Sequence, residues 1–324
     1  MPSPVAIPHQ QFLDPEWIVP LAERARAVVD QSKAPNTVRA YRADWIHFSQ
    51  WCAERNLEVL PAAPEVVVLY LTDLAGHAKV STLNRRLSAI GQAHQIAGHE
   101  SPTHSTPVRQ LMARVRRTRT VTTTAKRPVL VEDLKAMLDQ LPPGLLGLRD
   151  RALLLLGFTG AFRRSELVAL NCEDLERRPD GFVATIRRSK TDKEARGRMV
   201  AIPRGHQEER TCPVAAVEAW LAAAGIESGS VFRLINRHGH VLSNRLSGEA
   251  VALVVKRWAE ALGYDPAQFA GHSLRAGLAT SAARAGKSEF AIMQQTGHRS
   301  VATVRRYIRE GNLFRENAAE GLGL

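Results

Sequence analysis

The chain has 324 residues, 44% of them hydrophobic, so it is long enough for two domains that each bury a core. Its 44 Lys and Arg residues outnumber 32 Asp and Glu residues, and the net charge of +12 favours a polyanionic partner, either nucleic acid or an anionic membrane. The longest apolar stretch, residues 153–158, is far shorter than the ~18 residues needed to span a bilayer, so the sequence argues against a membrane protein.

The N-terminal part of the chain is predicted to be helical. Residues 1–30 are interrupted by prolines and are expected to form a flexible segment. Apolar residues then recur at helical spacing over residues 36–56. Further helical stretches are expected at residues 64–75, 81–98 and 108–117. Because no strand pattern is present, the sequence predicts an all-α domain over residues 31–117 rather than a mixed one.

A basic linker is expected to follow this domain. Residues 118–127 have neither helical period nor strand alternation, and residues 101–131 contain no acidic side chain. Ten extended residues span up to ~33 Å, which is enough to cross a DNA major groove about 12 Å wide. We interpret the stretch as a path along phosphates; the alternative is a solvated basic connection.

The second domain, residues 128–324, is predicted to be mixed but mostly helical. Two strands, at residues 181–188 and 198–203, are expected to form a small antiparallel β-sheet, with Lys190 in their connection. Helices are expected at residues 148–158, 163–170, 213–224, 249–262, 272–285, 288–296 and 300–310. The predicted fold class is therefore mainly α.

The cysteines and the N-terminal sequence indicate the cellular compartment of the protein. The three cysteines, Cys52, Cys172 and Cys212, are far apart and form no CxxC pair. The N-terminus carries prolines and acidic residues but no apolar signal core. The sequence thus predicts a cytoplasmic protein without structural zinc.

One tyrosine near the C-terminus is surrounded in sequence by basic residues. A tyrosine ordinarily has a pKa near 10, so ionising it at neutral pH costs ~4 kcal/mol and requires a proton acceptor or adjacent cations. The candidates near Tyr307 are Arg305, Arg306, His298 and His272. Taken alone, Tyr307 is more readily a structural tyrosine than a nucleophile.

His298 and Tyr307 are nine residues apart, so on one unbroken helix they would face opposite ways. They can share a phosphate only if the chain bends between them. Gly297, and Ser300 as a helix cap, supply the means. The tyrosine is then expected on a short helix of its own.

Two arginines could hold a phosphate. His272 and Arg275 are at i and i+3 and project from one helical face. A guanidinium binds two phosphate oxygens at once and stays charged, and Arg163 would supply a second one. Glu166, one turn beyond Arg163, could orient an active-site cation or be a simple intrahelical partner. Each arginine could also be an ordinary surface residue.

Lys190, in the sequence SKTDK, could protonate a leaving 5′ oxygen, because a lysine beside two arginines should have a lowered pKa. Lys193 is a competing choice. No GxxxxGK[ST] motif and no carboxylate cluster suited to magnesium is present, so we expect no metal and no cofactor. This favours an energy-neutral transesterification that retains the phosphodiester energy in a phosphotyrosine bond.

In order, spacing and flanking sequence, these residues resemble the tyrosine recombinase (phage integrase) family. The family pattern is Arg, Lys, His-x-x-Arg, His or Trp, then Tyr, and it falls on Arg163, Lys190, His272, Arg275, His298 and Tyr307. The N-terminal part resembles the core-binding domain of Cre-like, two-domain members. The stretch TGAFRRSE has one more residue between Gly and Arg than many members have, and counting back from Glu166 selects Arg163 over Arg164.

The resemblance implies a mechanism and an assembly. Tyr307 would form a 3′-phosphotyrosyl link and release a 5′ hydroxyl, with Lys190 as general acid and His272 assisting proton transfer or binding the phosphate. Double-stranded DNA with inverted-repeat sites would be the partner, bound by a homodimer and synapsed as a homotetramer. Residues 312–324 would dock on a neighbouring protomer or pack on their own domain.

The residues that read the DNA sequence are the least specified. Thr82, Arg85 and Arg86 begin a helix placed like a major-groove reader. Arg side chains favour guanine edges in that groove. Further candidates for DNA contacts are Arg116, Arg117, Arg119, Arg245 and Glu249. Most protein–DNA contacts position the protein without specifying sequence. Two alternative functions are a type IB topoisomerase with the same chemistry and a non-catalytic DNA-binding protein.

Overall fold

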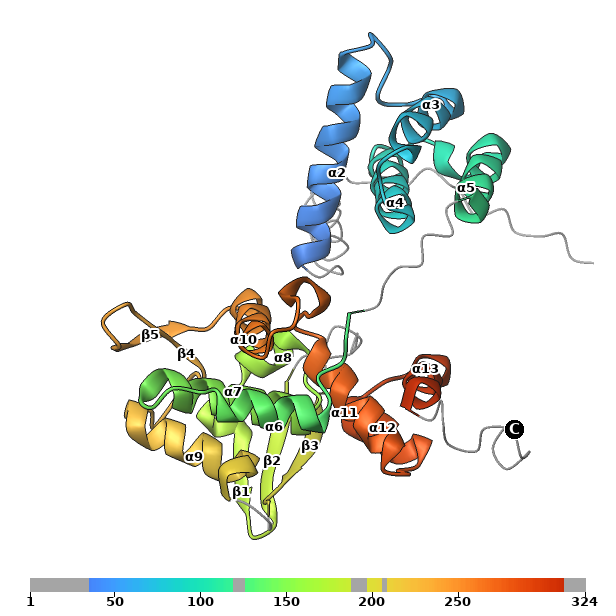
Figure 1. Ribbon diagram of the computed structural model, residues 1–324. Coiled ribbons are helices and arrows are strands. Elements are labelled where there is room, and N and C mark those ends of the chain that lie inside the picture. The colour runs from blue at the N-terminus through green and yellow to red at the C-terminus, as the bar shows by residue number, and fades with distance from the viewer. Residues whose placement is uncertain (1–34, 119–125, 188–196, 206–208, 312–324) are drawn as a thin grey trace, which may run out of the picture. The chain divides into compact units, whose positions relative to one another are not determined.

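The computed structural model describes residues 35–118, 126–187, 197–205 and 209–311. The chain divides into two compact units, residues 1–123 and residues 124–324, each of which is taken here by itself (Figure 1). None of the helices in the described ranges combines the length and the hydropathy that crossing a bilayer requires.

The N-terminal unit is built from helices, and no strand occurs over residues 35–118. Its elements are α2 (Pro35–Ala53), α3 (Pro64–Ala75), α4 (Val80–Ile96), the 3₁₀ helix η1 (Pro102–His104) and α5 (Thr106–Thr118). The apolar residues that set the helical period form its core. Phe48, Tyr70, Leu71, Leu83 and Ile90 are all fully buried there.

The C-terminal unit is mixed, with more helix than strand. Its helices are α6 (Val131–Asp139), α7 (Leu145–Thr159), α8 (Arg164–Ala169), η2 (Cys172–Asp174), η3 (Glu209–Thr211), α9 (Pro213–Ala224), α10 (Gly248–Ala261), η4 (Pro266–Gln268), α11 (Ser273–Arg284), α12 (Glu289–Thr296) and α13 (Val301–Gly311). Its strands are β1 (Leu175–Arg178), β2 (Gly181–Ile186), β3 (Arg198–Pro203), β4 (Arg233–Ile235) and β5 (Val241–Arg245). The predicted class, mainly α with a small antiparallel sheet, is confirmed.

The larger sheet has the order β1-β2-β3, and both pairings are antiparallel. Phe182 of β2 lies opposite Ile202 of β3, and both are buried. Along β3 the side chains alternate, with Val200 inside and Met199 outside, as expected for a strand that covers a core on one face. A second small sheet pairs β4 with β5.

Helix α7 forms the centre of this unit. Residues 152–158 of α7 are all buried and apolar, so this part of the helix is apolar on every side, as expected for a helix inside a core. It packs against α9 and also contacts α8 and α11. Because α8 and α11 both rest on this helix, their ends are held in fixed positions.

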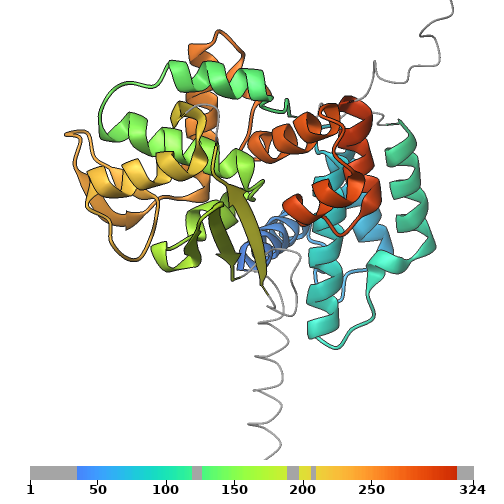
Figure 2. The same cartoon turned by 90° about the horizontal axis from the view of Figure 1, so that it is seen from below.

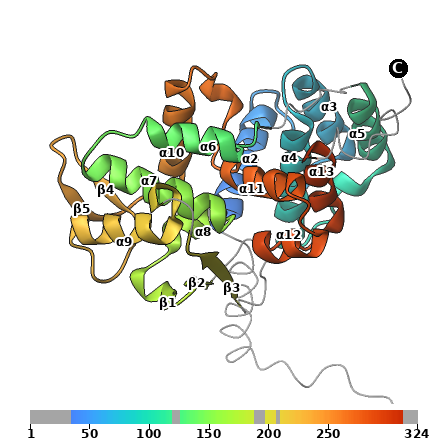
Figure 3. The same ribbon diagram turned by 60° about the horizontal axis from the view of Figure 1, so that its bottom comes forward.

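The last three helices, α11, α12 and α13, pack together around a small core of their own (Figure 2). Ala279, Ala283, Ile292 and Val304 are its buried members, and Tyr307 packs against them. The group lies beside β3 (Figure 3), where the Gln295 side-chain amide donates to the Ala201 carbonyl at 3.0 Å. This contact fixes α12 against the edge strand.

Two residues of the predicted linker are packed on the C-terminal unit. The Lys126 ammonium donates to the Ala267 carbonyl, and the Arg127 amide donates to the Gln268 carbonyl at 2.8 Å. The Arg127 guanidinium also lies 4.1 Å from the centre of the Tyr264 ring. The chain is thus anchored to this unit from residue 126 onward.

Candidate active site

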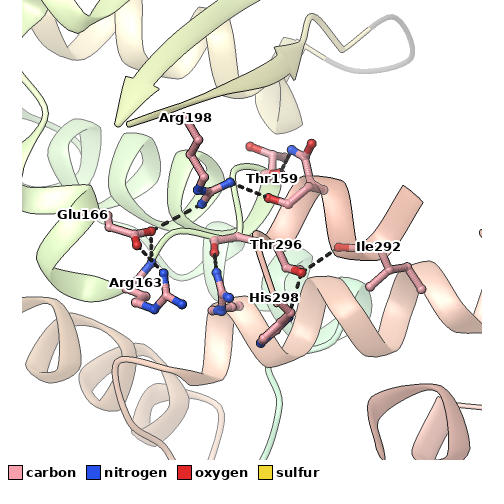
Figure 4. Close-up of polar contacts among 10 residues, drawn as sticks. Thr159, Arg163, Glu166, Arg198, Ile292, Thr296 and His298 are labelled. Atoms are coloured by element: carbon pink, nitrogen blue, oxygen red, sulfur yellow. Dashed lines mark hydrogen bonds and ion pairs between the residues drawn. The ribbon is translucent and has the colours of Figure 1, made fainter. Parts of the chain in front are cut away.

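Three regions that are distant in sequence meet beside β3. They are the buried side of α11 with Arg275, the start of α8 with Arg163, and the corner between α12 and α13 with His298; Figure 4 shows Arg163 and His298. Tyr307 reaches the same place from α13. The structure therefore brings four of the predicted residues together.

Arg163 immediately precedes α8 and is held by Glu166. The Glu166 carboxylate accepts from the Arg163 backbone amide at 3.0 Å and from its Nη1 at 2.5 Å. The first contact satisfies a free amide at the helix start, and the second aligns the guanidinium. Glu166 is only 2% exposed, so it is a buried carboxylate that needs positive partners. Arg164, the alternative in the sequence, is exposed and lies against Gly248 and Gly271 instead.

A second arginine holds Glu166, and the sequence did not single it out. Arg198, the first residue of β3, donates from Nη2 to Glu166 at 3.4 Å and from Nη1 to the Gln295 carbonyl at 3.1 Å (Figure 4). Burial, opposed by Glu166, lowers its pKa. The sequence held no signal for this role, because the burial of Glu166 becomes visible only in the fold. The partner could not be chosen without the fold.

Arg275 is buried on α11 and donates from Nη1 to the Ala161 carbonyl at 2.7 Å. Its Nη2 is buried and has no hydrogen-bond partner among the residues that the structure describes. Burial first, and then the neighbouring Arg163, lower its pKa to about 10, so it remains charged at neutral pH. A charged buried nitrogen without a partner is suited to receive an anion.

Ala161 lies in the stretch between Gly160 and Arg163 that is one residue longer than in many members of the resembled family, and it has a φ of +47°. An alanine in this left-handed region costs about 1–2 kcal/mol. The conformation turns the Ala161 carbonyl towards Arg275, while the Phe162 ring covers Gly160 so closely that a Cβ atom there would lie 2.1 Å from it. The backbone of this stretch thus supports Arg275.

The predicted bend between His298 and Tyr307 is present. Gly297 ends α12 with a φ of +64°, and α13 begins at Val301. The two rings come to 5.9 Å between centroids, and the Arg306 guanidinium lies 5.4 Å from the centre of the Tyr307 ring. Burial, then Arg275, Arg163, Arg198 and Arg306, lower the pKa of His298 to about 4, so its ring is neutral near pH 7.

Two other predicted members of the site are His272 and Lys190. His272 immediately precedes α11 and is exposed. Lys190, and Lys193 as its alternative, lie outside the described residues. Within the described ranges there is no group of three or more His, Cys, Asp or Glu side chains that could hold a metal ion.

Two arginines predicted to read DNA bases are engaged within the N-terminal unit. Arg85, on the first turns of α4, donates to Asp44 of α2 at 2.7 and 3.0 Å. Arg86 donates to the Tyr70 hydroxyl at 3.0 Å and is mostly buried. Thr82 is half-buried on the same helix. Base contacts by these residues remain a prediction, and contacts by Arg86 would require it to leave Tyr70.

The remaining candidates for DNA contacts differ in their hydrogen bonds and in their exposure. Arg245 donates to the Val168 and Leu170 carbonyls at 2.5 and 3.2 Å, and so supports the end of α8. Arg116 donates to Asn84 at 3.1 Å. Arg117 and Glu249 are exposed, and Arg119 lies outside the described residues.

Comparison with known proteins gives consistent findings. The sequence model of the phage integrase family matches residues 129–312, and that of the phage integrase N-terminal SAM-like domain matches residues 28–101. An integrase/recombinase XerD homolog of Selenomonas ruminantium is 43% identical over 302 residues, which are 92% of this chain and 88% of the relative. Recombinase Cre of Escherichia phage P1 is 27% identical over 292 residues, covering 84% of this chain and 82% of Cre.

The fold is also that of solved structures. A lambda integrase dimer bound to a COC′ core site superposes with a TM-score of 0.57 at 16% identity, over 89% of this chain and 75% of that one. XerH recombinase bound to its difH substrate gives the same TM-score at 14% identity, over 83% of this chain and 75% of that one. At such identities the likeness supports the fold alone.

Proposed function

The chain belongs to the phage integrase family of tyrosine recombinases, enzymes that cleave and rejoin DNA, and from this premise we propose that it is a site-specific recombinase acting through a 3′-phosphotyrosyl bond on Tyr307. Arg163, Arg275 and His298 would bind the scissile phosphate, Lys190 would act as general acid and His272 would assist. Glu166 would hold the arginines in place.

One observation carries the proposal. Tyr307 shares a cluster with Arg163, Arg275 and His298, and that cluster contains a buried guanidinium nitrogen without a partner in the described part of the chain. A phosphodiester supplies the missing anion. As charge builds on its non-bridging oxygens, fixed cations in a partly dry site stabilise the transition state.

The chemistry balances without an external energy source. The Tyr307 oxygen attacks phosphorus, the Oη–P bond forms, and the P–O5′ bond breaks. The leaving 5′ oxygen takes a proton from Lys190, and the phenol proton passes to a base in the site. Attack by a 5′ hydroxyl of another strand reverses the steps and releases the tyrosine.

DNA with inverted repeats is the proposed substrate. XerH is described with a palindromic difH substrate, and lambda integrase as a dimer on a core site, which supports one protomer per half-site here. Two such dimers would form the synaptic tetramer, with residues 312–324 exchanged between protomers. Residues 31–117 and residues 128–324 would each contact DNA, and the basic linker 118–127 would follow the phosphates. Acting on DNA, the enzyme would work in the cytoplasm, at the nucleoid.

Plasmid assays test this function. Binding sites selected from random duplex DNA by the full chain would be placed in pairs on a supercoiled plasmid. A recombinase exchanges the two sites and leaves a plasmid without a site unchanged, and Tyr307→Phe abolishes the exchange. Relaxation of a plasmid without a site would instead indicate a topoisomerase, and binding without either reaction a non-catalytic protein.

A further inference from the structure

The Arg85 guanidinium is held by a buried carboxylate between α2 and α4. Asp44 of α2 is 4% exposed, and it accepts from Nε of Arg85 at 2.7 Å and from Nη2 at 3.0 Å. Two parallel hydrogen bonds of this kind fix the plane of a guanidinium as well as its position. The other oxygen-to-arginine distance is longer, since Oδ1 of Asp44 lies 3.7 Å from Nε of Arg86.

One edge of the Arg85 guanidinium is left for a further partner. An arginine carries five N–H donors in a rigid fork, and the bonds to Asp44 use the edge formed by Nε and Nη2. Nη1 of Arg85 makes no hydrogen bond to any residue that the structure describes. The Arg85 side chain is 47% exposed, whereas that of Arg86 is 14% exposed and bonds the Tyr70 hydroxyl. Arg85 is thus accessible in a fixed orientation, with the edge formed by Nη1 and Nη2 available.

The surface of α4 around Arg85 suits a DNA groove. Arg85 stands between Ser81, four residues before it, and Ser88, three residues after it, and all three are exposed. Short side chains on both sides allow the helix to approach a partner closely, and the major groove of B-DNA is wide enough to admit an α-helix. Asp44 can neutralise only one of Arg85 and Arg86, so a positive charge remains at this place.

A rigid fork of two donors distinguishes between the bases. In the major groove guanine offers two acceptors, N7 and O6, whereas adenine offers one acceptor and one donor. Because Asp44 already holds the Arg85 side chain, less rotamer freedom is lost when both bonds to a guanine form. The contact between α2 and α4 therefore favours a bidentate contact to this base.

We propose that Asp44 is a positioning residue for DNA sequence recognition, which holds Arg85 so that Nη1 and Nη2 donate to one guanine of the target site. The proposal rests on the proposed function, since it concerns how the recombinase recognises its site. It gives the ion pair between α2 and α4 a role beyond joining the two helices.

Base preference is the readout, because the ratio of two affinities measured on one sample does not depend on how much of the protein is folded. A half-site selected from random duplex DNA by the full chain would be changed one base pair at a time, and each affinity measured by fluorescence anisotropy. We expect Arg85→Ala to lose a preference of about 10- to 100-fold for G·C at one base pair, the discrimination of a bidentate contact. Arg85→Lys, which keeps the charge without the fork, should lose the same preference.

Asp44→Asn should lower the preference at that same base pair by about 5-fold or more, because an amide offers the guanidinium only one acceptor. Preferences at the other base pairs should be kept. In the Arg85→Ala chain, Asp44→Asn should change no preference further. Asp73→Asn is the matched control, because Asp73 lies in the same unit and accepts from Trp51 at 2.6 Å. It should keep every preference.

The wild-type preference at every base pair in Asp44→Asn would overturn the proposal. An Arg85→Ala chain that loses affinity equally for all duplexes would overturn it too, since Arg85 would then contact only phosphate. So would an Arg85→Lys chain that keeps the preference for guanine. The proposed function fails by a different result, namely a wild type that forms no covalent adduct with a nicked suicide duplex. Base preferences are measured at equilibrium without cleavage, so the two failures are distinguishable.

Discussion

The Arg198 guanidinium lies directly against Gly297, so that a Cβ atom at Gly297 would stand 2.9 Å from Arg198 Nε. The same guanidinium bonds Glu166 and the Gln295 carbonyl. Arg198 therefore joins the support of Arg163 to the corner that carries His298. We expect the alignment of Tyr307 with Arg163 and Arg275 to depend on this contact between Arg198 and Gly297.

Gly297→Ala tests the contact between Arg198 and Gly297. Its φ of +64° disfavours alanine by about 1–2 kcal/mol, and the new methyl group must also displace Arg198. We expect a loss of stability in chemical denaturation and a larger loss of DNA cleavage than of DNA binding. Gly225→Ala is the matched control, because Gly225 also ends a helix, with a φ of +61°, and has open space where Cβ would be. Equal cleavage by the two variants would show that the contact between Arg198 and Gly297 does not align the site.

Arg198→Met should weaken the support of Arg163, because Arg198 bonds the Glu166 carboxylate that holds it. The substitution removes two hydrogen bonds of a charged group, each worth about 1.5–3 kcal/mol, and takes away one of the two arginines that bond Glu166. Cleavage should fall more than DNA affinity in a binding and single-turnover comparison. Arg177→Met, which breaks an exposed ion pair with Glu218, should change stability by less than about 1 kcal/mol and leave cleavage unchanged.

Stability should depend on pH through His298. Its pKa is about 4 in the folded chain and near 6.5 when unfolded, so the unfolded chain binds more protons between these values. The free energy of unfolding should fall as pH drops from about 6.5 to about 4. His298→Gln should flatten this part of the profile in urea titrations, whereas His238→Gln, at an exposed turn, should not. An unchanged slope in His298→Gln would contradict the neutral buried ring.

DNA binding should depend steeply on salt. If about eight phosphates are neutralised, the logarithm of the association constant should fall with the logarithm of salt concentration with a slope of about −7. Fluorescence anisotropy with a labelled duplex measures this slope. An association constant that does not change with salt concentration would contradict the binding of DNA phosphates by the basic residues.

Much of the helical framework could be predicted because local signals define it. Helix α3 begins and ends where the sequence indicates, since Pro64 starts a strong apolar period. Helix α9 likewise begins at Pro213 and ends before Gly225, which adopts a left-handed conformation. The elements α6, β1, β4 and β5 were not predicted. Strand β1, LERR, is largely exposed and charged, and it is a strand only because it pairs with β2.

The residues of the candidate site likewise fall into those that the sequence predicts and those that it does not. Arg163, Arg275, His298 and Tyr307 could be selected because they stand in short motifs with a chemical reason. Arg198 could not, since its role depends on contacts made after folding. Asp44 is a further example. It lies 41 residues before Arg85, and nothing local indicates that the two are paired.

The central claim is that Tyr307 becomes covalently joined to DNA, and a suicide duplex tests it most directly. The duplex carries a nick near the cleavage position, so that the short strand is lost and the covalent product accumulates. We expect the wild type and Tyr41→Phe to form a protein–DNA adduct on a denaturing gel, with the nucleotide mapped to the peptide containing Tyr307, and Tyr307→Phe to form none. An adduct of equal yield in Tyr307→Phe, or none in the wild type on DNA that it binds, would contradict the claim.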